Sequence, residues 1–209
     1  MTQSKLATSR QSGNHQVEEQ RERILDVAQA LFLQQGLENT TMVDIARAAG
    51  ITKVTLYRYF PNRDEIALAV YPRMLQKIVW LLGPTDPPLS LANARLLAQA
   101  MIRHFDTLRE AYRFFGVFDA LYLDHPPQAD TAKWTSQRLS DLPWLQANWT
   151  ADPQEQRAIV VLSSVIWFLE KVALRDDGTG SVQGIPVAAQ LQILEEIVTV
   201  YIEHLLAQP

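Results

Sequence analysis

The stretch TTMVDIARAAGITKVTLYRYFPNRDEI, from Thr40 to Ile66, decides the fold of this 209-residue chain. Its first half opens with Thr41 and carries Asp44 three residues later, which is the pattern of a capping box at a helix start. Its apolar positions recur at the spacing of one helical face: Met42, Ile45, Ala46 and Ala49. Gly50 supplies a turn, so the pattern predicts a short helix that ends at a glycine.

A second short helix is expected directly after this turn, from Lys53 to about Phe60. Thr52 can cap it, and Leu56 shares an inward face with Phe60 because the two residues are four positions apart. The remaining side chains are basic, hydroxylic or aromatic and project elsewhere: Lys53, Thr55, Tyr57 and Arg58. This arrangement is typical of a helix-turn-helix that reads the major groove of DNA. An ordinary helical hairpin is the alternative that geometry alone leaves open.

The charge of the chain limits the nucleic-acid contact that it can make. There are 19 Lys and Arg against 23 Asp and Glu, a formal net charge of -4, which disfavours non-specific coating of DNA. From Ile45 to Arg63, however, the chain has no acidic residue while it carries Arg47, Lys53 and Arg58. DNA contact is therefore expected to be local to this window, although charge alone does not separate it from a chance acid-free run.

Helical patterning begins at about Val17 and predicts a first helix that ends near Gly36. Its apolar stripe contains Ile24, Ala28, Leu31 and Phe32. Residues 1–16 have no apolar period and are predicted to form a flexible tail to which we assign no role. Together with the two short helices, this gives a three-helix DNA-binding domain over residues 17–66.

An all-α second domain is predicted over residues 67–209. Asn62 and Glu65 can cap a helix that runs to Leu82, and Pro72 should kink or divide that helix near residues 68–72. A boundary is expected at residues 83–88. Further helical periods lie at about residues 89–109, 110–122, 129–139, 153–175 and 186–207, with no pattern of a strand ladder.

The stretch from Thr40 to Ile66 closely resembles the DNA-binding region of the TetR family of regulators, above all in the L-Y-x-Y-F core from Leu56 to Phe60. The resemblance in motif covers roughly residues 21–70. It implies an N-terminal helix-turn-helix domain before a larger helical domain. It also implies a homodimer, usually a repressor, that is released from a palindromic DNA operator when a small molecule binds the second domain.

Carried over position by position, the resemblance implies two groups of DNA contacts. The expected base-reading residues are Lys53, Val54, Thr55 and Arg58, and the expected phosphate contacts are Thr41, Tyr57, Tyr59 and Arg63. Arg58 and Lys53 can donate to guanine, and Thr55 can reach a base edge or a thymine methyl. Many family members carry glycine where this chain has Val54. That valine either contacts a base directly or fills space and tilts the helix.

The last two helices are expected to pair with a second copy of the chain. Residues 158–169 are apolar almost all round, and a helix of that kind must be covered on more than one face. The final helix has an apolar stripe that contains Leu191, Leu194, Val198, Tyr201 and Leu205. The family resemblance places its dimer bundle on the same two helices. A monomeric core is the alternative.

A small hydrophobic or aromatic effector is expected to bind the second domain. Side chains proposed to touch it are Arg103, His104, Tyr112, Phe115, Trp134 and Trp167, although most aromatic residues at helical spacing must belong to the core. Pro72 is a candidate hinge between effector binding and the DNA-binding domain, with a static kink as the simpler interpretation.

Other classes of protein find less support in the sequence. There is no cysteine, the four histidines have no metal-ligand spacing, and no phosphate loop is present, so we expect no enzyme, metal or cofactor. No signal peptide or membrane-spanning stretch is recognised, which favours the cytoplasm. An activator with a protein-interaction module is the main alternative, and an all-helical enzyme is a more distant one.

Overall fold

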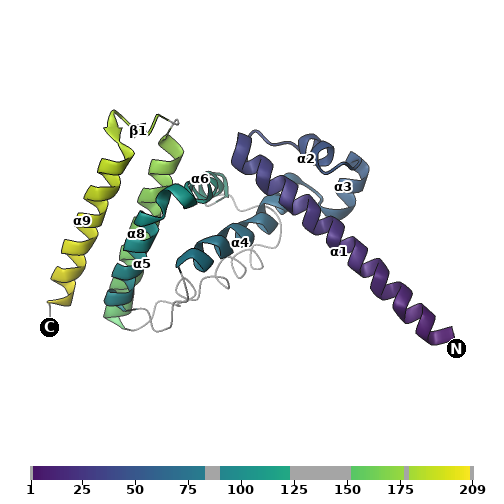
Figure 1. The fold of residues 1–209 in the computed structure, drawn as a ribbon, viewed down its shortest axis with the longest axis horizontal. Coiled ribbons are helices and arrows are strands. Elements are labelled where there is room, and N and C mark those ends of the chain that lie inside the picture. Colours follow the sequence, from purple (N-terminus) through teal and green to yellow (C-terminus); the bar gives the residue numbers. More distant parts are fainter. Residues whose placement is uncertain (1, 83–89, 123–151, 177–178, 208–209) are drawn as a thin grey trace. The chain divides into compact units, whose positions relative to one another are not determined.

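The computed structural model describes residues 2–82, 90–122, 152–176 and 179–207 (Figure 1). The chain forms two compact units, residues 1–70 and residues 71–209; the sequence predicts the division four residues earlier, after Ile66. In chain order, the elements are α1 (Thr2–Gln35), α2 (Met42–Ala48), α3 (Lys53–Tyr59), α4 (Arg63–Leu82), α5 (Leu91–Arg103), α6 (Phe105–Tyr122), α8 (Pro153–Arg175), β1 (Ser181–Val182), β2 (Ile185–Pro186) and α9 (Val187–Leu206). The predicted all-α class is confirmed. None of the described helices is long and apolar enough to cross a membrane.

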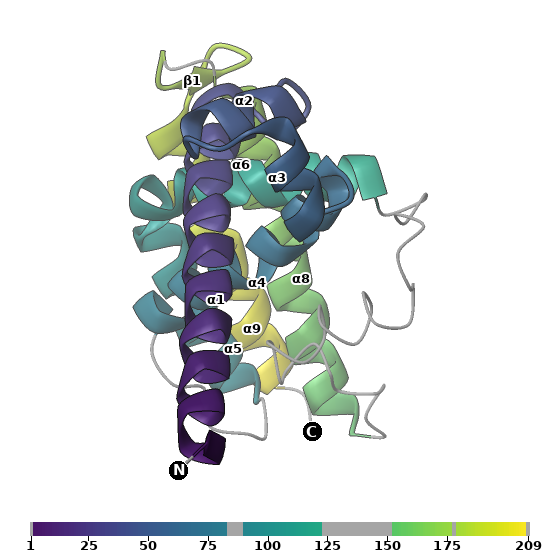
Figure 2. The ribbon, with the colours of Figure 1, turned by 90° about the vertical axis from the view of Figure 1, so that its right-hand side faces the viewer.

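The first unit is built on one small core to which α1, α2, α3 and the start of α4 all contribute. In this unit α2 packs against both α1 and α3 (Figure 2). The buried core side chains include Ile24, Leu25, Phe32, Leu37, Ile45, Leu56, Phe60 and Ile66. Full burial of each large apolar side chain is worth about 1.5–3 kcal/mol, so this core fixes the orientation of the short helix α3.

Two glycines make the turns that set α2 and α3 in place. Gly36 (φ +90°) follows α1 and Gly50 (φ +67°) lies between α2 and α3, both in the left-handed region that favours glycine. After α2, the amide of Ile51 donates to the carbonyl of Ala46 at 3.0 Å. The turn that the sequence predicts at Gly50 is therefore confirmed.

Two predictions about the first 82 residues differ from the structure. Helix α1 begins at Thr2, whereas a flexible tail is predicted over residues 1–16. That segment lacks an apolar stripe, but it contains no proline and a single glycine, so nothing in it forbids the helix from continuing. Pro72 lies inside the single helix α4, so of the two predicted outcomes, a kink or a division, the division does not occur.

In the second unit, α8 packs against α5 and α6, and α9 packs against α5. Helix α5 ends at Arg103, and the amide of the capping residue His104 donates to the carbonyl of Ala100 at 3.0 Å. The sequence predicts that this helix ends six residues later, at about Arg109, because the apolar period continues through the break. Helices α6 and α8 approach closely at Gly116: a Cβ there would lie 2.6 Å from the side chain of Leu174.

A two-residue antiparallel hairpin, β1–β2, precedes α9 and corrects the prediction that the chain has no strand pairing. Its turn residues, Gln183 (φ 54°) and Gly184 (φ 77°), both have the positive φ of a type I′ turn. Gln190 donates from Nε2 to the carbonyls of Val182 and Ile185, at 3.2 and 3.0 Å. Strands of two residues are too short to produce an alternating sequence pattern. The predicted boundary at residues 83–88 and helix at 129–139 lie outside the described residues.

Candidate nucleic-acid interface

The start of α2 has the predicted capping box. The hydroxyl of Thr41 accepts from the amide of Asp44 at 3.2 Å, and the Asp44 carboxylate accepts from the hydroxyl and amide of Thr41 at 2.6 and 3.1 Å. These bonds, the hydroxyl first, hold the pKa of the Asp44 carboxyl below its usual value, with a smaller contribution from Arg47. Both donors of Thr41 are engaged, so a phosphate contact from this residue would have to replace one of these bonds.

Helix α3 is capped by Thr52, whose hydroxyl accepts from the amide of Thr55 at 3.1 Å. The two hydroxyls also lie within hydrogen-bond distance, at 2.9 Å. Leu56 is completely buried and holds the inner face of α3 on the core. The predicted cap and inward face are therefore confirmed, and α3 turns its other side outward.

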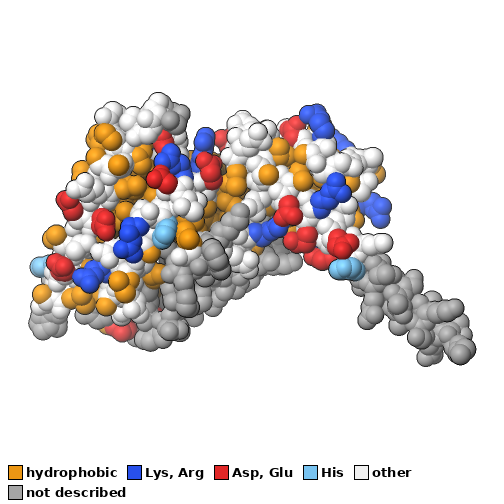
Figure 3. Space-filling model, in the orientation of Figure 1, with side chains coloured by type: hydrophobic (Ala, Val, Ile, Leu, Met, Phe, Trp, Pro, Cys, Tyr) orange, Lys and Arg blue, Asp and Glu red, His pale blue; other side chains and the backbone are white. Residues whose placement is uncertain are grey.

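The outward side of α3 carries the side chains that the sequence predicts as DNA contacts. Lys53, Val54, Tyr57 and Arg58 are exposed, while Thr55 and Tyr59 are half-buried. The ammonium of Lys53 lies 5.7 Å from the centre of the Tyr57 ring. In the part of the chain that the structure describes, Arg58 has no acidic partner. Figure 3 shows several Lys and Arg side chains on the face over α2 and α3.

Arg63 has structural contacts that local sequence patterns did not reveal. Its guanidinium donates to the carbonyls of Leu37 and Glu38, at 3.3 and 3.2 Å, and lies 3.6 Å from the carboxylate of Asp64. It therefore ties the start of α4 to the loop between α1 and α2. A phosphate contact by Arg63 stays a prediction. The guanidinium would have to make that contact in addition to, or in place of, its bonds to the two carbonyls and to Asp64.

Arg21 also helps to hold α3 in place, and the sequence pattern does not identify it. Its guanidinium lies 4.9 Å from the centre of the Phe60 ring and so covers the residue that ends α3. Helical spacing identifies the face on which Arg21 lies but not a partner 39 positions further along the chain, and only the folded unit brings the two together.

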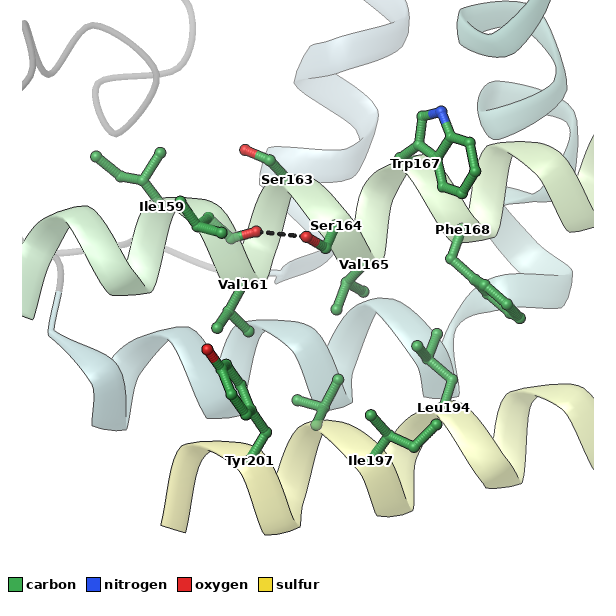
Figure 4. A pocket seen from close by; sticks show the side chains of 12 residues that line it. Ile159, Val161, Ser163, Ser164, Val165, Trp167, Phe168, Leu194, Ile197 and Tyr201 are labelled. Atoms are coloured by element: carbon green, nitrogen blue, oxygen red, sulfur yellow. Dashed lines mark hydrogen bonds between the residues drawn. The ribbon is translucent and has the colours of Figure 1, made fainter. Parts of the chain in front are cut away.

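A second exposed surface lies between α8 and α9 and is apolar (Figure 4). It is a groove of about 810 Å³ whose lining includes Val161, Val165, Trp167, Phe168, Ile197 and Tyr201. Phe168 of α8 points toward Leu194 of α9 in Figure 4. Trp167 is 60% exposed and Ile197 is 59% exposed. We refer to this surface as the α8–α9 groove.

The side chains predicted to touch an effector do not converge on one place. Tyr112 and Phe115 are buried in α6, Arg103 is exposed, His104 ends α5, and Trp167 lies at the α8–α9 groove. Trp134 lies outside the described residues. Among the residues that the structure describes, no group of three potential metal ligands occurs.

The hydroxyl of Tyr112 is buried inside the second unit, and none of the described residues forms a hydrogen bond with it. Burial raises the pKa of this phenol well above its usual value, and the negative charge of the nearby Glu170 raises it further. Tyr112 is therefore neutral, and its hydroxyl is a buried polar group that lacks the hydrogen bond such groups normally have.

Comparisons with known proteins agree with the helix-turn-helix. Residues 24–70 match the family model described as bacterial regulatory proteins, tetR family. The chain is 41% identical over 51 residues to the HTH-type transcriptional regulator AcrR of Shigella flexneri, covering 24% of each protein. It is 29% identical over 125 residues to the HTH-type transcriptional repressor KstR2 of Mycolicibacterium smegmatis, covering 59% of this chain and 53% of that protein.

The similarity in fold extends over the second unit. A tetR-family transcriptional regulator of Streptomyces coelicolor is similar with a TM-score of 0.55 and 24% identity, covering 92% of this chain and 90% of that one. The sequence matches to AcrR and KstR2 span only about a quarter and about half of those proteins. The capped helix pair and the family match agree: residues 24–70 are similar to the DNA-binding region of the TetR family of bacterial regulatory proteins, and the described chain shares its helical fold with a solved tetR-family regulator.

Proposed function

We propose that this protein is a homodimeric transcriptional regulator that binds a palindromic DNA operator and represses the genes beside it. The observation that carries this function is the exposed face of α3. A short capped helix is fixed to the core by Leu56 and presents Lys53, Val54 and Arg58 to solvent, with no acidic residue between Ile45 and Arg63. A helix of this kind fits the major groove of DNA.

In the proposed complex, α3 supplies the base contacts and its surroundings supply the phosphate contacts. Lys53 and Arg58 donate to guanine, and each good contact of this kind is worth about 1–3 kcal/mol of discrimination. Tyr57 and Tyr59 donate to phosphates, and Arg63 adds charge at the start of α4. We assign Thr41 to the cap of α2 rather than to phosphate, because both of its donors bond to Asp44.

The proposed dimer forms when a second copy of the chain covers the α8–α9 groove. An exposed apolar groove that continues along two helices is characteristic of a protein interface. A second copy is the occupant that the function requires, because one helix-turn-helix reads one half-site. Two such motifs must lie about 34–36 Å apart to reach successive major grooves.

Release from DNA is proposed to follow binding of a small apolar or aromatic effector in the second unit. The aromatic side chains of α6 and the unpartnered Tyr112 hydroxyl support an effector with an apolar body and one polar group, which would bond to that hydroxyl. Phe115 remains a proposed contact, as do the more exposed Arg103 and His104, whereas Trp167 lines the α8–α9 groove that the second copy is proposed to cover. A regulator of this type acts in the cytoplasm, where the operator is accessible.

The function is tested by selecting the preferred DNA from a random pool with the full chain. We expect a palindrome, and we expect Arg58→Ala to weaken its binding while Arg113→Ala, an exposed arginine of α6, leaves it unchanged. Failure to enrich a palindrome, or full affinity in both Arg58→Ala and Tyr57→Ala, contradicts the assignment. A reporter gene that carries the operator distinguishes the proposed repressor from an activator.

A further inference from the structure

Val54 is an apolar side chain on the face of α3 that is proposed to bind DNA. It is 75% exposed, the largest exposed fraction among the large hydrophobic side chains that the structure describes as exposed. It lies two residues before the completely buried Leu56, and two residues correspond to about 200° around a helix. Val54 therefore points away from the core, and no packing within the first unit accounts for it.

The position of Val54 relative to Arg58 shows which face it belongs to. The two residues are four positions apart, so they lie one turn apart on the same face of α3. The neighbouring Lys53 extends over the Tyr57 ring, and Thr55 shares a hydrogen bond with Thr52. The side chain of Val54 is therefore an exposed aliphatic group that lies one helical turn before the guanidinium of Arg58.

Only one of the four bases of DNA presents an apolar group in the major groove, namely the C5 methyl of thymine. A valine cannot form a hydrogen bond, so its approach to any other base edge would leave donors or acceptors without water or a partner. Since valine is β-branched, it has few rotamers in a helix and loses little freedom on contact. These properties favour thymine at the base pair that Val54 faces.

We infer that Val54 makes the regulator specific for a thymine methyl in each half-site of its operator. One helical turn is about 5.4 Å long and one DNA base step is about 3.4 Å. The thymine therefore lies within about two base pairs of the guanine that Arg58 contacts. This inference rests on the proposed function, and it adds a base identity at one position of the operator.

The test replaces thymines of the selected operator by deoxyuridine, one symmetric pair at a time. Deoxyuridine keeps the base pair and removes only the methyl group. Affinity is measured by fluorescence anisotropy at fixed salt for the wild type, Val54→Ala and Val43→Ala, an exposed valine of α2 that serves as the control. We expect one thymine position at which the substitution weakens wild-type binding about fourfold per half-site, the value of one buried methyl group.

The two variants separate direct contact from an indirect effect. Val54→Ala should lose the sensitivity to deoxyuridine at that position alone, whereas Val43→Ala should keep the wild-type profile. A flat profile for the wild type, or the same sensitive position in Val54→Ala, overturns the inference. A change in affinity without any change in methyl sensitivity would show instead that Val54 fills space and tilts α3, which also overturns it.

Failure of this inference is distinguishable from failure of the proposed function. If a palindrome is selected and Arg58→Ala weakens its binding, then a flat deoxyuridine profile removes the role of Val54 and leaves the regulator in place. If no palindrome is selected, both are overturned. Because Val54 is exposed, we expect Val54→Ala to unfold at the same temperature as the wild type, so a change in DNA binding reports on the interface alone.

Discussion

The outer face of α3 and the α8–α9 groove are both exposed, but they differ in chemistry. The α3 face combines the exposed cations of Lys53 and Arg58 with the exposed Val54, whereas the groove is lined by aliphatic and aromatic side chains from two helices. Cations on a surface remain well solvated until they bind DNA, where they displace the counterions condensed on its phosphates. A broad apolar groove is costly to leave open in water, and it favours a permanent partner.

From this difference we expect the two surfaces to be occupied in a fixed order, with a second copy of the chain on the groove first and DNA on α3 second. In the proposed dimer, the second copy covers the α8–α9 groove without DNA and brings two α3 helices into one particle. We then expect the operator to bind that pair of helices. A substitution in the groove should therefore reduce operator binding without touching the DNA, while a substitution on α3 should leave the dimer intact.

The largest effect is expected from a charge placed in the groove. Ile197→Asp adds a carboxylate that would be buried and unpaired in the dimer, at a cost of about 3–5 kcal/mol per site. Light scattering should then show a particle near the 23.7 kDa of one chain, and affinity for the palindrome should fall with it.

Ala188→Asp is the control for that prediction, because Ala188 is exposed on α9 but does not line the groove. It should remain dimeric and bind the operator normally. A dimeric Ile197→Asp protein would show that the copies meet elsewhere on the chain.

The second largest effect is expected on the stability of the first unit. Helix α3 has a buried face that stabilises this unit and an exposed face that is proposed to bind DNA. Leu56→Ala removes a completely buried side chain and should lower the free energy of unfolding by about 2–5 kcal/mol. Arg58→Ala removes an exposed side chain and should change that free energy by less than about 0.5 kcal/mol. Urea denaturation of both variants measures the contrast, and equal losses of stability would mean that Arg58 also packs on the core.

The helix-turn-helix was predictable from the sequence because its determinants are local. The caps at Thr41, Thr52 and Asn62 each accept a hydrogen bond from a backbone amide three residues along the chain. A spacing of that kind is visible in the sequence itself. The outward face of α3 followed from the burial of Leu56 and Phe60 on the opposite side.

The remaining features depend on contacts between distant residues, which no local pattern encodes. Arg63 bonds to a loop 25 and 26 positions earlier, and Arg109 pairs with Asp176, which lies 67 positions later. The apolar period predicts that α8 is covered on several faces, but it does not show that Trp167 opens onto a groove while Tyr112 is buried within the unit. The predicted effector residues therefore did not assemble into one site.

A smaller effect is expected at the cap of α2. Thr41→Ala removes one hydrogen bond to the α2 amides and should cost about 1 kcal/mol of stability, whereas Thr41→Ser keeps the hydroxyl and most of that stability. Thermal unfolding at neutral pH measures the difference. Equal unfolding temperatures for the alanine variant and the wild type would mean that the capping box does not stabilise the unit.

The same cap should make this difference in stability depend on pH. The folded pKa of Asp44 lies below its unfolded value of about 3.9, so its stabilising contribution is fully present above that value. It is lost as the pH falls through the folded pKa, when protonation removes the acceptor charge. Since Thr41→Ala lacks the hydroxyl that lowers this pKa most, wild type and variant should converge in stability in acid. A difference that stays constant from pH 7 to pH 2 would contradict this role of Asp44.

The smallest effect compares two lysines that lie over aromatic rings at the same distance. Lys53 lies 5.7 Å from the centre of the Tyr57 ring on α3, and Lys171 lies 5.7 Å from that of Trp167 beside the groove. Operator affinity should fall linearly with the logarithm of salt concentration, and Lys53→Gln should lower that slope because it removes a positive charge that displaces counterions from the DNA. Lys171→Gln should leave the slope unchanged, because its ring belongs to the apolar surface. Equal slopes in the two variants would mean that Lys53 meets no phosphate or base, and that local geometry alone does not separate the DNA-binding face from the rest of the protein.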